Sequence, residues 1–248
     1  MSLPDAVDIQ HTWRYELKYK LTYQQYRQVR TALAPYTAFD SYTKAKPSNK
    51  YVVRSLYFDT PDYQAYDEKL NGNHSRYKFR IRTYSDALAN DTVIHVEAKL
   101  RQGAKSEKLG TFVSIDAYCE FMERYHWPAV ENPILIEFER SVHSRILRPK
   151  VLIEYHREGY QCRGREDIRI TFDHHVHSAQ AKSLFPRQAF FRQHNSHEIV
   201  LEIKHRDQQP EWLKGVVQAH GLKVEPNSKY CQGIEITQLD FVNHALRL

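Results

Sequence analysis

The chain has 248 residues, of which 41% are hydrophobic and 27% charged, and its formal net charge is +6. This composition is typical of a globular protein with a sizeable core, and the positive charge favours an anionic partner. No apolar run approaches the ~18 residues of a membrane span, and no secretory signal is present, so we expect no transmembrane segment. Three widely spaced cysteines argue against a disulfide framework and favour a reducing cytoplasm. We expect residues 1–11 to be a disordered lead and residues 12–248 to form one domain.

The N-terminal half is predicted to combine strands with short helices. Alternating apolar and charged residues, or runs of β-branched and aromatic residues, predict strands at residues 14–21, 51–59, 76–84 and 92–101. Thr22 and Gln25 have the spacing of a capping box, which predicts a helix that ends before Pro35. A short helix is expected at residues 62–70. Two polar segments are expected to be irregular, the second a hairpin or mobile loop: residues 35–49 and 102–110.

The C-terminal half continues this mixture. Helices are expected at residues 114–124, 133–147 and 210–220, and a last helix is expected to begin after Ser228. Pro210 is expected at the first helical position and Gly221 at the end of that helix. Strands are expected at residues 150–157, 165–173 and 198–206, with an irregular segment at residues 178–196.

Residues 76–84 carry the clearest charge pattern. Arg76, Lys78, Arg80 and Arg82 share one strand face, and the opposite face is mostly apolar. Such neighbours lie about 7 Å apart and repel one another unless water or an anion screens them. By itself this face is compatible with either a solvated sheet surface or a phosphate-binding surface.

The same construction recurs in five more predicted strands. Three of these strands carry a Glu-x-Lys pair on one face, and two carry an arginine there: Glu16 and Lys18, Glu97 and Lys99, Glu202 and Lys204, Arg157, and Arg169. If these faces point outward, the apolar faces form an ordinary barrel core. The predicted helices, however, also need an apolar sheet face to pack against. Helices outside a barrel would cover the apolar faces and leave the charged faces to line the interior.

A basic interior of this kind needs a polyanion. Unpaired buried cations are unfavourable by several kcal/mol each. An eight-stranded barrel has room for about one slender ligand, and arginine forks and lysine charges match a linear phosphate chain. The carboxylates are explained by a hard divalent cation, because Mg²⁺ or Mn²⁺ binds one or two carboxylates together with phosphate oxygens.

Eight short motifs follow one another along the chain. They are Glu16-Leu-Lys18-Tyr, Ser55-Leu-Tyr-Phe-Asp59, Lys78-Phe-Arg80-Ile-Arg82, Glu97-Ala-Lys99, Tyr155-His-Arg157, Asp167-Ile-Arg169-Ile, Glu202-Ile-Lys204 and Ser228-Lys229-Tyr230. Over about residues 12–235 their order resembles the VTC domain, the polyphosphate polymerase domain of the vacuolar transporter chaperone proteins. That domain belongs to the triphosphate tunnel metalloenzyme superfamily. The resemblance implies an α+β fold in which an eight-stranded antiparallel β-barrel forms a tunnel with flanking helices.

The resemblance also implies roles for individual residues. The phosphate-gripping catalytic residues would be Lys18, Arg80, Arg82, Lys99, Arg157, Arg169 and Lys229. Further substrate-binding residues would be Lys204, Ser228, Arg101 and Lys78. Glu202 would bind Mn²⁺ or Mg²⁺, and Glu97 and Glu16 are weaker candidates. A single Glu precedes Lys18 where the wider superfamily has Glu-x-Glu-x-Lys, and this argues against its adenylate cyclase and thiamine triphosphatase branches.

The predicted function is metal-dependent phosphoryl transfer, with a polyphosphate polymerase that uses the γ-phosphate of ATP as the first choice. A tripolyphosphatase and a non-catalytic polyphosphate-binding module remain alternatives. The expected ligands are a nucleoside triphosphate and a polyphosphate or triphosphate. A membrane-protein partner is compatible with the resemblance, whereas nucleic acid is not expected because no recognisable motif is present.

Two other clusters are not predicted to be functional sites, and their histidines and lysines are expected to be exposed. Asp173, His174, His175 and His177 resemble a metal cluster, but no third ligand accompanies His175 and His177 on their strand face. The lysines near the two polar segments are interpreted as solvated surface: Lys44, Lys46, Lys105 and Lys108.

Overall fold

The computed structural model describes residues 14–238 except residues 74, 90–91, 103–104 and 129–130. The described strands form a single antiparallel sheet with the order β2-β7-β3-β4-β5-β6-β1-β10-β8-β9, and β7 also pairs with β8. Their bounds are β1 Arg14–Leu21, β2 Thr37–Phe39, β3 Tyr51–Asp59, β4 Ser75–Thr83, β5 Ile94–Gln102, β6 Lys105–Val113, β7 Arg148–Cys162, β8 Arg165–Ala179, β9 Arg192–Gln193 and β10 Ile199–His205.

Eight of these strands close into a ring, because β7 and β8, the second strand from each end of the sheet, pair with each other. The ring is well paired between β1 and β10, with seven partners from Tyr15↔His205 to Leu21↔Ile199. The β1–β6 seam is narrower, with partners at Arg14↔Ser106 and Tyr15↔Lys105. The short strands β2 and β9 extend the sheet outside the ring. The predicted eight-stranded antiparallel tunnel with flanking helices is therefore confirmed.

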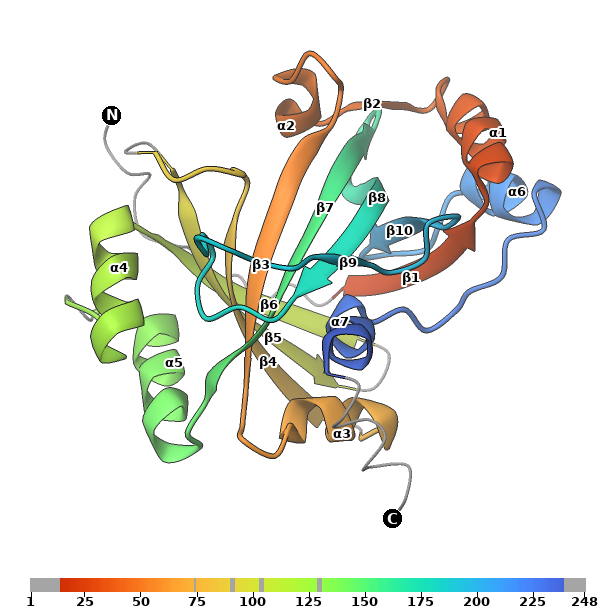
Figure 1. Ribbon diagram of the computed structural model, residues 1–248. Coiled ribbons are helices and arrows are strands. Elements are labelled where there is room, and N and C mark those ends of the chain that lie inside the picture. The colour runs from red at the N-terminus through yellow and green to blue at the C-terminus, as the bar shows by residue number, and fades with distance from the viewer. Residues whose placement is uncertain (1–13, 74, 90–91, 103–104, 129–130, 239–248) are drawn as a thin grey trace.

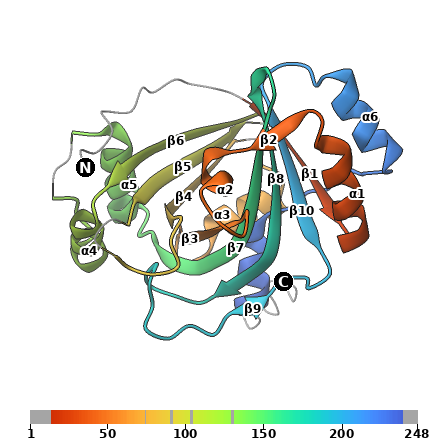
Figure 2. The ribbon, with the colours of Figure 1, turned by 90° about the horizontal axis from the view of Figure 1, so that it is seen from above.

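Seven described helices surround the strands (Figures 1 and 2). They are α1 Tyr23–Leu33, α2 Ser41–Lys44, α3 Gln64–Leu70, α4 Ile115–Arg124, α5 Pro133–Ser144, α6 Glu211–Ala219 and α7 Lys229–Thr237. Figure 2 shows α4 and α5 together on one side of the barrel and α1 and α6 on the opposite side. No helix among the described residues is long and apolar enough to cross a membrane.

The apolar strand faces pack outward against these helices. Phe79 of β4 stacks on Phe138 of α5 with ring centroids 4.9 Å apart, in a cluster that also contains Phe121 of α4. On the other side, Leu201 of β10 shares a buried cluster with Leu33 of α1. Because each strand alternates its faces, packing the apolar residues against outer helices directs the charged residues to the interior of the ring.

The structure corrects the sequence interpretation in three segments. Residues 102–110 were expected to be a hairpin or loop, but residues 105–113 form β6, which pairs with β5 along its length. The expected loop at residues 35–49 contains β2 and α2. Pro210 is the N-cap of α6 and not its first helical residue. The expected disordered lead at residues 1–11 lies outside the described residues.

Several helix boundaries agree with the sequence. Thr22 and Gln25 form both hydrogen bonds of the capping box at the start of α1. Ser228 caps α7 by accepting a hydrogen bond from the Cys231 amide. Gly221 has φ +59°, so it supplies the left-handed conformation that follows α6. The caps at Thr22 and Ser228 fix where β1 ends and where α7 begins beside the barrel.

Candidate functional site

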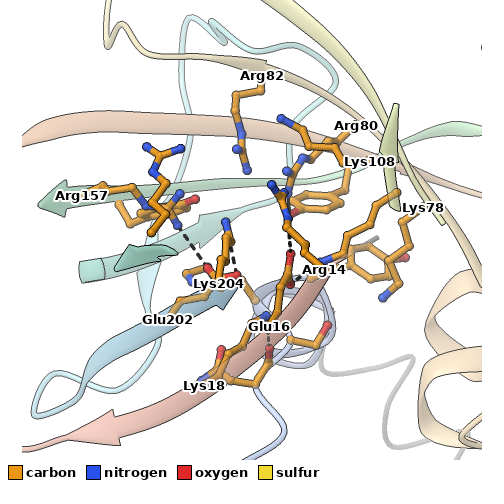
Figure 3. Close-up of a pocket in the computed structure, with 18 of the residues that line it drawn as sticks. Arg14, Glu16, Lys18, Lys78, Arg80, Arg82, Lys108, Arg157, Glu202 and Lys204 are labelled. Carbon is orange, nitrogen blue, oxygen red and sulfur yellow. Dashed lines mark hydrogen bonds and ion pairs between the residues drawn. The ribbon is translucent and has the colours of Figure 1, made fainter. Parts of the chain in front are cut away.

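A cavity of about 230 Å³ lies inside the barrel, and all eight ring strands contribute side chains to it (Figure 3). Of its twenty lining residues in the described chain, twelve are Lys or Arg and two are Glu. The basic residues are Arg14, Lys18, Lys69, Lys78, Arg80, Arg82, Lys99, Lys108, Arg157, Arg169, Lys204 and Lys229. This excess of positive charge makes the cavity suited to a multiply charged anion.

The wall built by β4, β5 and β6 is organised around Glu97, whose side chain is 1% exposed. Its carboxylate accepts a hydrogen bond from Nε of Arg80 and pairs with Nζ of Lys108. Arg82 Nε lies 3.9 Å away, and His95 Nδ1 lies 2.8 Å from the other oxygen. Burial raises the pKa of Glu97, but these cations hold it well below its usual value. Glu97 is thus an ionised carboxylate already surrounded by cations.

The wall built by β1 and β10 carries two carboxylates that line the cavity. Glu16 accepts a hydrogen bond of 2.5 Å from Lys99, and Glu202 lies 3.4 Å from Lys204 and 3.6 Å from Arg157. Burial and the Glu202 charge raise the pKa of Glu16, whereas Lys99 and two neighbouring lysines lower it to about 2. Both carboxylates face the cavity from adjacent strands (Figure 3).

A third group of contacts fixes the basic side chains of β7 and α7. Asp173 is fully buried and accepts two hydrogen bonds from Arg157, at 2.6 and 2.8 Å. It also accepts a hydrogen bond of 2.6 Å from Lys229. Burial raises the pKa of Asp173, but Arg157 and Lys229 lower it far more, so the group remains ionised. Asp173 therefore holds two cations from different elements at the cavity wall.

Three cavity lysines have a pKa below the ordinary lysine value, mainly because they are buried. Burial lowers the pKa of Lys204 well below the ordinary lysine value, and nearby arginines lower it further despite two neighbouring carboxylates. Burial likewise lowers the pKa of Lys18 and of Lys108, and neighbouring cations add to the effect. A bound polyanion would offset this repulsion and raise the pKa of these lysines.

The positive charge of the cavity also affects the hydroxyl of Tyr57 in β3. Its hydroxyl accepts a hydrogen bond of 2.8 Å from Arg80. Burial raises the pKa of Tyr57, but Arg80 and Arg82 outweigh it and lower the value to about 8. The sequence analysis assigns no role to this tyrosine, although it lies on the same strand face as Ser55, which accepts a hydrogen bond from Arg82.

The family follows from comparison with known proteins. A family model for the VTC domain matches residues 13–238. The chain belongs to the VTC domain family. A comparison with curated proteins finds none that matches it.

Two solved structures share the fold of this VTC domain. A candidate adenylate cyclase from Bacillus halodurans has a TM-score of 0.52 at 14% identity, over 87% of this chain and 93% of its own. The PH1819 protein from Pyrococcus horikoshii OT3 has a TM-score of 0.52 at 13% identity, over 90% of this chain and 99% of its own. At these identities the likeness concerns the fold alone.

The structure brings most of the predicted site residues of the VTC domain to the cavity. Twelve of the fourteen line it: Glu16, Lys18, Lys78, Arg80, Arg82, Lys99, Arg157, Arg169, Glu202, Lys204, Ser228 and Lys229. Glu97 lies behind the basic side chains and is not among the lining residues. The side chain of Arg101 lies outside the described part of the structure.

Several lining residues of the VTC domain were not predicted. Lys108 was interpreted as solvated surface, but it pairs with Glu97 inside the barrel. Its place was recoverable from the alternation of Leu109, Thr111 and Val113 with the residues between them. Asn227 was also missed, and its carbonyl accepts a hydrogen bond of 2.9 Å from Lys18. The remaining unpredicted lining residues are Arg14, Tyr57, Lys69, Tyr84, Tyr155 and Tyr230.

Glu16 and Glu202 fit a divalent cation better than Glu97 does. No group of three or more His, Cys, Asp or Glu side chains in the described chain is arranged to hold a metal ion. Mg²⁺ and Mn²⁺, however, are commonly held by one or two carboxylates with water and substrate phosphate oxygens. Glu16 and Glu202 line the phosphate-sized cavity and are ionised, whereas Glu97 is enclosed by cations. The expected metal role of Glu97 is therefore not supported by its surroundings.

Proposed function

We propose that this VTC domain is a metal-dependent polyphosphate polymerase that transfers the γ-phosphate of ATP to the end of a phosphate chain. The observation that carries the proposal is the cavity itself, with twelve basic residues and two ionised carboxylates inside a closed ring of strands. Phosphoryl transfer needs mainly positioning and neutralisation of charge, which such a cavity provides.

The arginines would hold phosphate oxygens in fixed directions. Arg80 is oriented by Glu97 and Tyr57, and Arg82 by Ser55. Arg157 is oriented by both oxygens of Asp173. Donors held in this way lose little conformational entropy when an anion binds, and they stabilise the charge that develops during transfer.

In the proposed step, an oxygen of the terminal phosphate of the acceptor chain forms a bond to the γ-phosphorus of ATP. The bond from that phosphorus to the β,γ-bridging oxygen breaks, and ADP leaves with the electron pair. A divalent cation bound by Glu202 and Glu16 would neutralise phosphate oxygens of the substrate. The basic residues of this chain bind both anions and offset their mutual repulsion.

The protonation states support a phosphate acceptor over water. A terminal phosphate is already ionised near pH 7, so it attacks without a general base. Water must lose a proton, and a carboxylate with a pKa near 2 is a poor base. Glu16 has a pKa of about 2, and the pKa of Glu202 lies well below its usual value because of Lys204, Lys18 and Arg157. Polymerase activity is therefore proposed ahead of hydrolysis.

The test is incubation of the purified protein with ATP and Mn²⁺, with the products resolved by gel electrophoresis. A ladder of phosphate chains and a matching amount of ADP are expected. Orthophosphate without chain growth would contradict the polymerase and indicate a tripolyphosphatase. Tight polyphosphate binding without any turnover would instead indicate a binding module. If the polymerase activity is present, we further propose that a membrane-protein partner receives the product.

A further inference from the structure

Three tyrosines lie together where β3 begins and β4 ends. The ring centroid of Tyr42, in α2, is 5.1 Å from that of Tyr84 and 5.6 Å from that of Tyr51. The Tyr51 and Tyr84 centroids are 5.8 Å apart. Figure 1 shows α2 at the end of the barrel where β3 starts. Tyr51 is buried, but Tyr42 is 47% exposed, so part of this aromatic cluster faces solvent.

The aromatic cluster adjoins the basic cavity. Tyr84 and Arg169 both line the cavity. Arg169 donates a hydrogen bond of 3.1 Å to the Tyr51 hydroxyl and one of 2.8 Å to Asp40, the residue that caps α2. A ligand that extends from the cavity past Arg169 would therefore reach the exposed ring of Tyr42.

α2 is fastened to the barrel by a compact set of hydrogen bonds. The Asp40 amide donates to the Gly159 carbonyl at 2.9 Å, and the Gly159 amide donates to the Thr43 hydroxyl at 2.8 Å. Thr43 in turn donates its amide to the Asp40 carboxylate at 2.8 Å. A Cβ at Gly159 would lie 2.1 Å from Asp40 Oδ2, so glycine is required for this close approach. The ring of Tyr42 is thus held in place before a ligand arrives.

We propose that Tyr42, backed by Tyr84 and Tyr51, is a stacking site for the base of a nucleoside triphosphate. This inference rests on the proposed function, in which a nucleoside triphosphate is the phosphate donor. Its phosphates are drawn into the basic cavity, and its base is an uncharged aromatic group that gains nothing from those cations. An exposed aromatic ring at the cavity rim offers the base a surface to stack on, with little preference among bases.

The inference is tested by comparing ATP with inorganic tripolyphosphate, which lacks a base. Binding is measured by calorimetry without divalent metal, so that no turnover occurs. Tyr42→Ala should weaken ATP binding by about 5- to 30-fold and change tripolyphosphate binding by less than about twofold. Tyr42→Trp should retain ATP binding and add a tryptophan signal that ATP quenches and tripolyphosphate does not.

Tyr23→Ala is the matched control, because Tyr23 is 66% exposed on α1 and is not among the cavity-lining residues. It should bind both ligands as the wild type does. Equal weakening of ATP and tripolyphosphate in Tyr42→Ala, or no change in either, would overturn the stacking site. Base-dependent ATP binding without chain growth in the polymerase assay would leave the stacking site standing and contradict the polymerase. Chain growth in the polymerase assay would support the polymerase. If the variants then affect ATP binding and tripolyphosphate binding alike, the stacking site is contradicted.

Discussion

Two walls of the cavity carry glutamates in the same Glu-x-Lys spacing, but these glutamates have different surroundings. On β5, Glu97 is 1% exposed and is enclosed by Arg80, Arg82 and Lys108. On β1 and β10, Glu16 and Glu202 line the cavity itself. The first carboxylate neutralises cations that belong to the protein, and the other two remain accessible to a ligand.

The difference comes from the neighbouring strands. β5 lies between β4 and β6, which direct three cations at one carboxylate. β1 and β10 are paired to each other, so Glu16 and Glu202 face the cavity from adjacent strands, and the charge of Glu202 raises the pKa of Glu16. A motif in one strand therefore does not determine a role until its partners across the ladder are known.

The largest effect is expected from removing the charge of Glu97. Glu97→Gln leaves three cations without their shared counter-ion, and we expect the free energy of unfolding to fall by about 2–4 kcal/mol. Urea unfolding measures this change. Added tripolyphosphate should restore part of the loss by supplying negative charge from the cavity. Unchanged stability would mean that Glu97 does not organise this wall.

Glu202→Gln should instead affect turnover. We expect chain synthesis with Mn²⁺ to fall about 100-fold or more, because a metal-binding carboxylate is lost. Its stability loss should be smaller than that of Glu97→Gln, since Arg157 keeps both of its contacts with Asp173. Tripolyphosphate binding without metal should be unchanged or tighter. Glu166→Gln, an exposed carboxylate on β8, is the control and should behave as the wild type. If Glu202→Gln keeps full activity, the proposed metal site is wrong.

The pH dependence of binding should follow Tyr57. Its pKa is about 8, below the ordinary tyrosine value, because of Arg80 and Arg82. Above that pH the phenolate adds negative charge, so tripolyphosphate affinity should fall, by at most about tenfold per pH unit for one linked proton. Tyr57→Phe should remove this contribution, and only the decline from lysine deprotonation should remain. An identical pH profile in both proteins would exclude Tyr57 as its source.

The smallest effect is expected from Lys108, which tests the unpredicted strand β6. Lys108→Ala removes one cavity cation, and tripolyphosphate affinity should fall by about three- to tenfold at low salt. The loss should shrink as salt is added, because screening weakens the interaction. Lys46→Ala, an exposed lysine beyond α2, should bind as the wild type. Equal losses of tripolyphosphate affinity in the two variants would mean that Lys108 acts as a surface charge and not as a cavity residue.

Strands with a regular alternation and an uninterrupted charged face were predictable from sequence. β1, β4 and β5 alternate clearly, and their charged faces meet in the cavity as expected. β6 was not predicted, because Gly110 and the lysines around it resemble a loop. In the structure Gly110 is required by packing, since a Cβ there would lie 2.5 Å from Nε2 of His95.

The aromatic part of the site was harder to predict than the charged part. A tyrosine fits the apolar face of a strand as well as the cavity face, so alternation does not place it. In β3, Arg54 alternates onto the same face as Val52, Leu56 and Phe58, so the sequence alone does not show which face is internal. The structure resolves the conflict by pairing Arg54 with Glu154 of β7 away from the cavity, while Tyr57 faces inward. The partners Arg54 and Glu154 are 100 residues apart in the chain, so the sequence around Arg54 does not predict their contact.

The pairing of β1 with β10 also has a consequence for synthesis. Residues 15–21 cannot pair with β10 until residues 199–205 have been made, so the ring closes late. Contacts of such long sequence separation slow folding. Lys229, which completes the cavity with Asp173, emerges later still. The nascent chain therefore exposes an unfinished basic surface, and a polyanion that binds only the completed barrel should shift the equilibrium toward the closed ring.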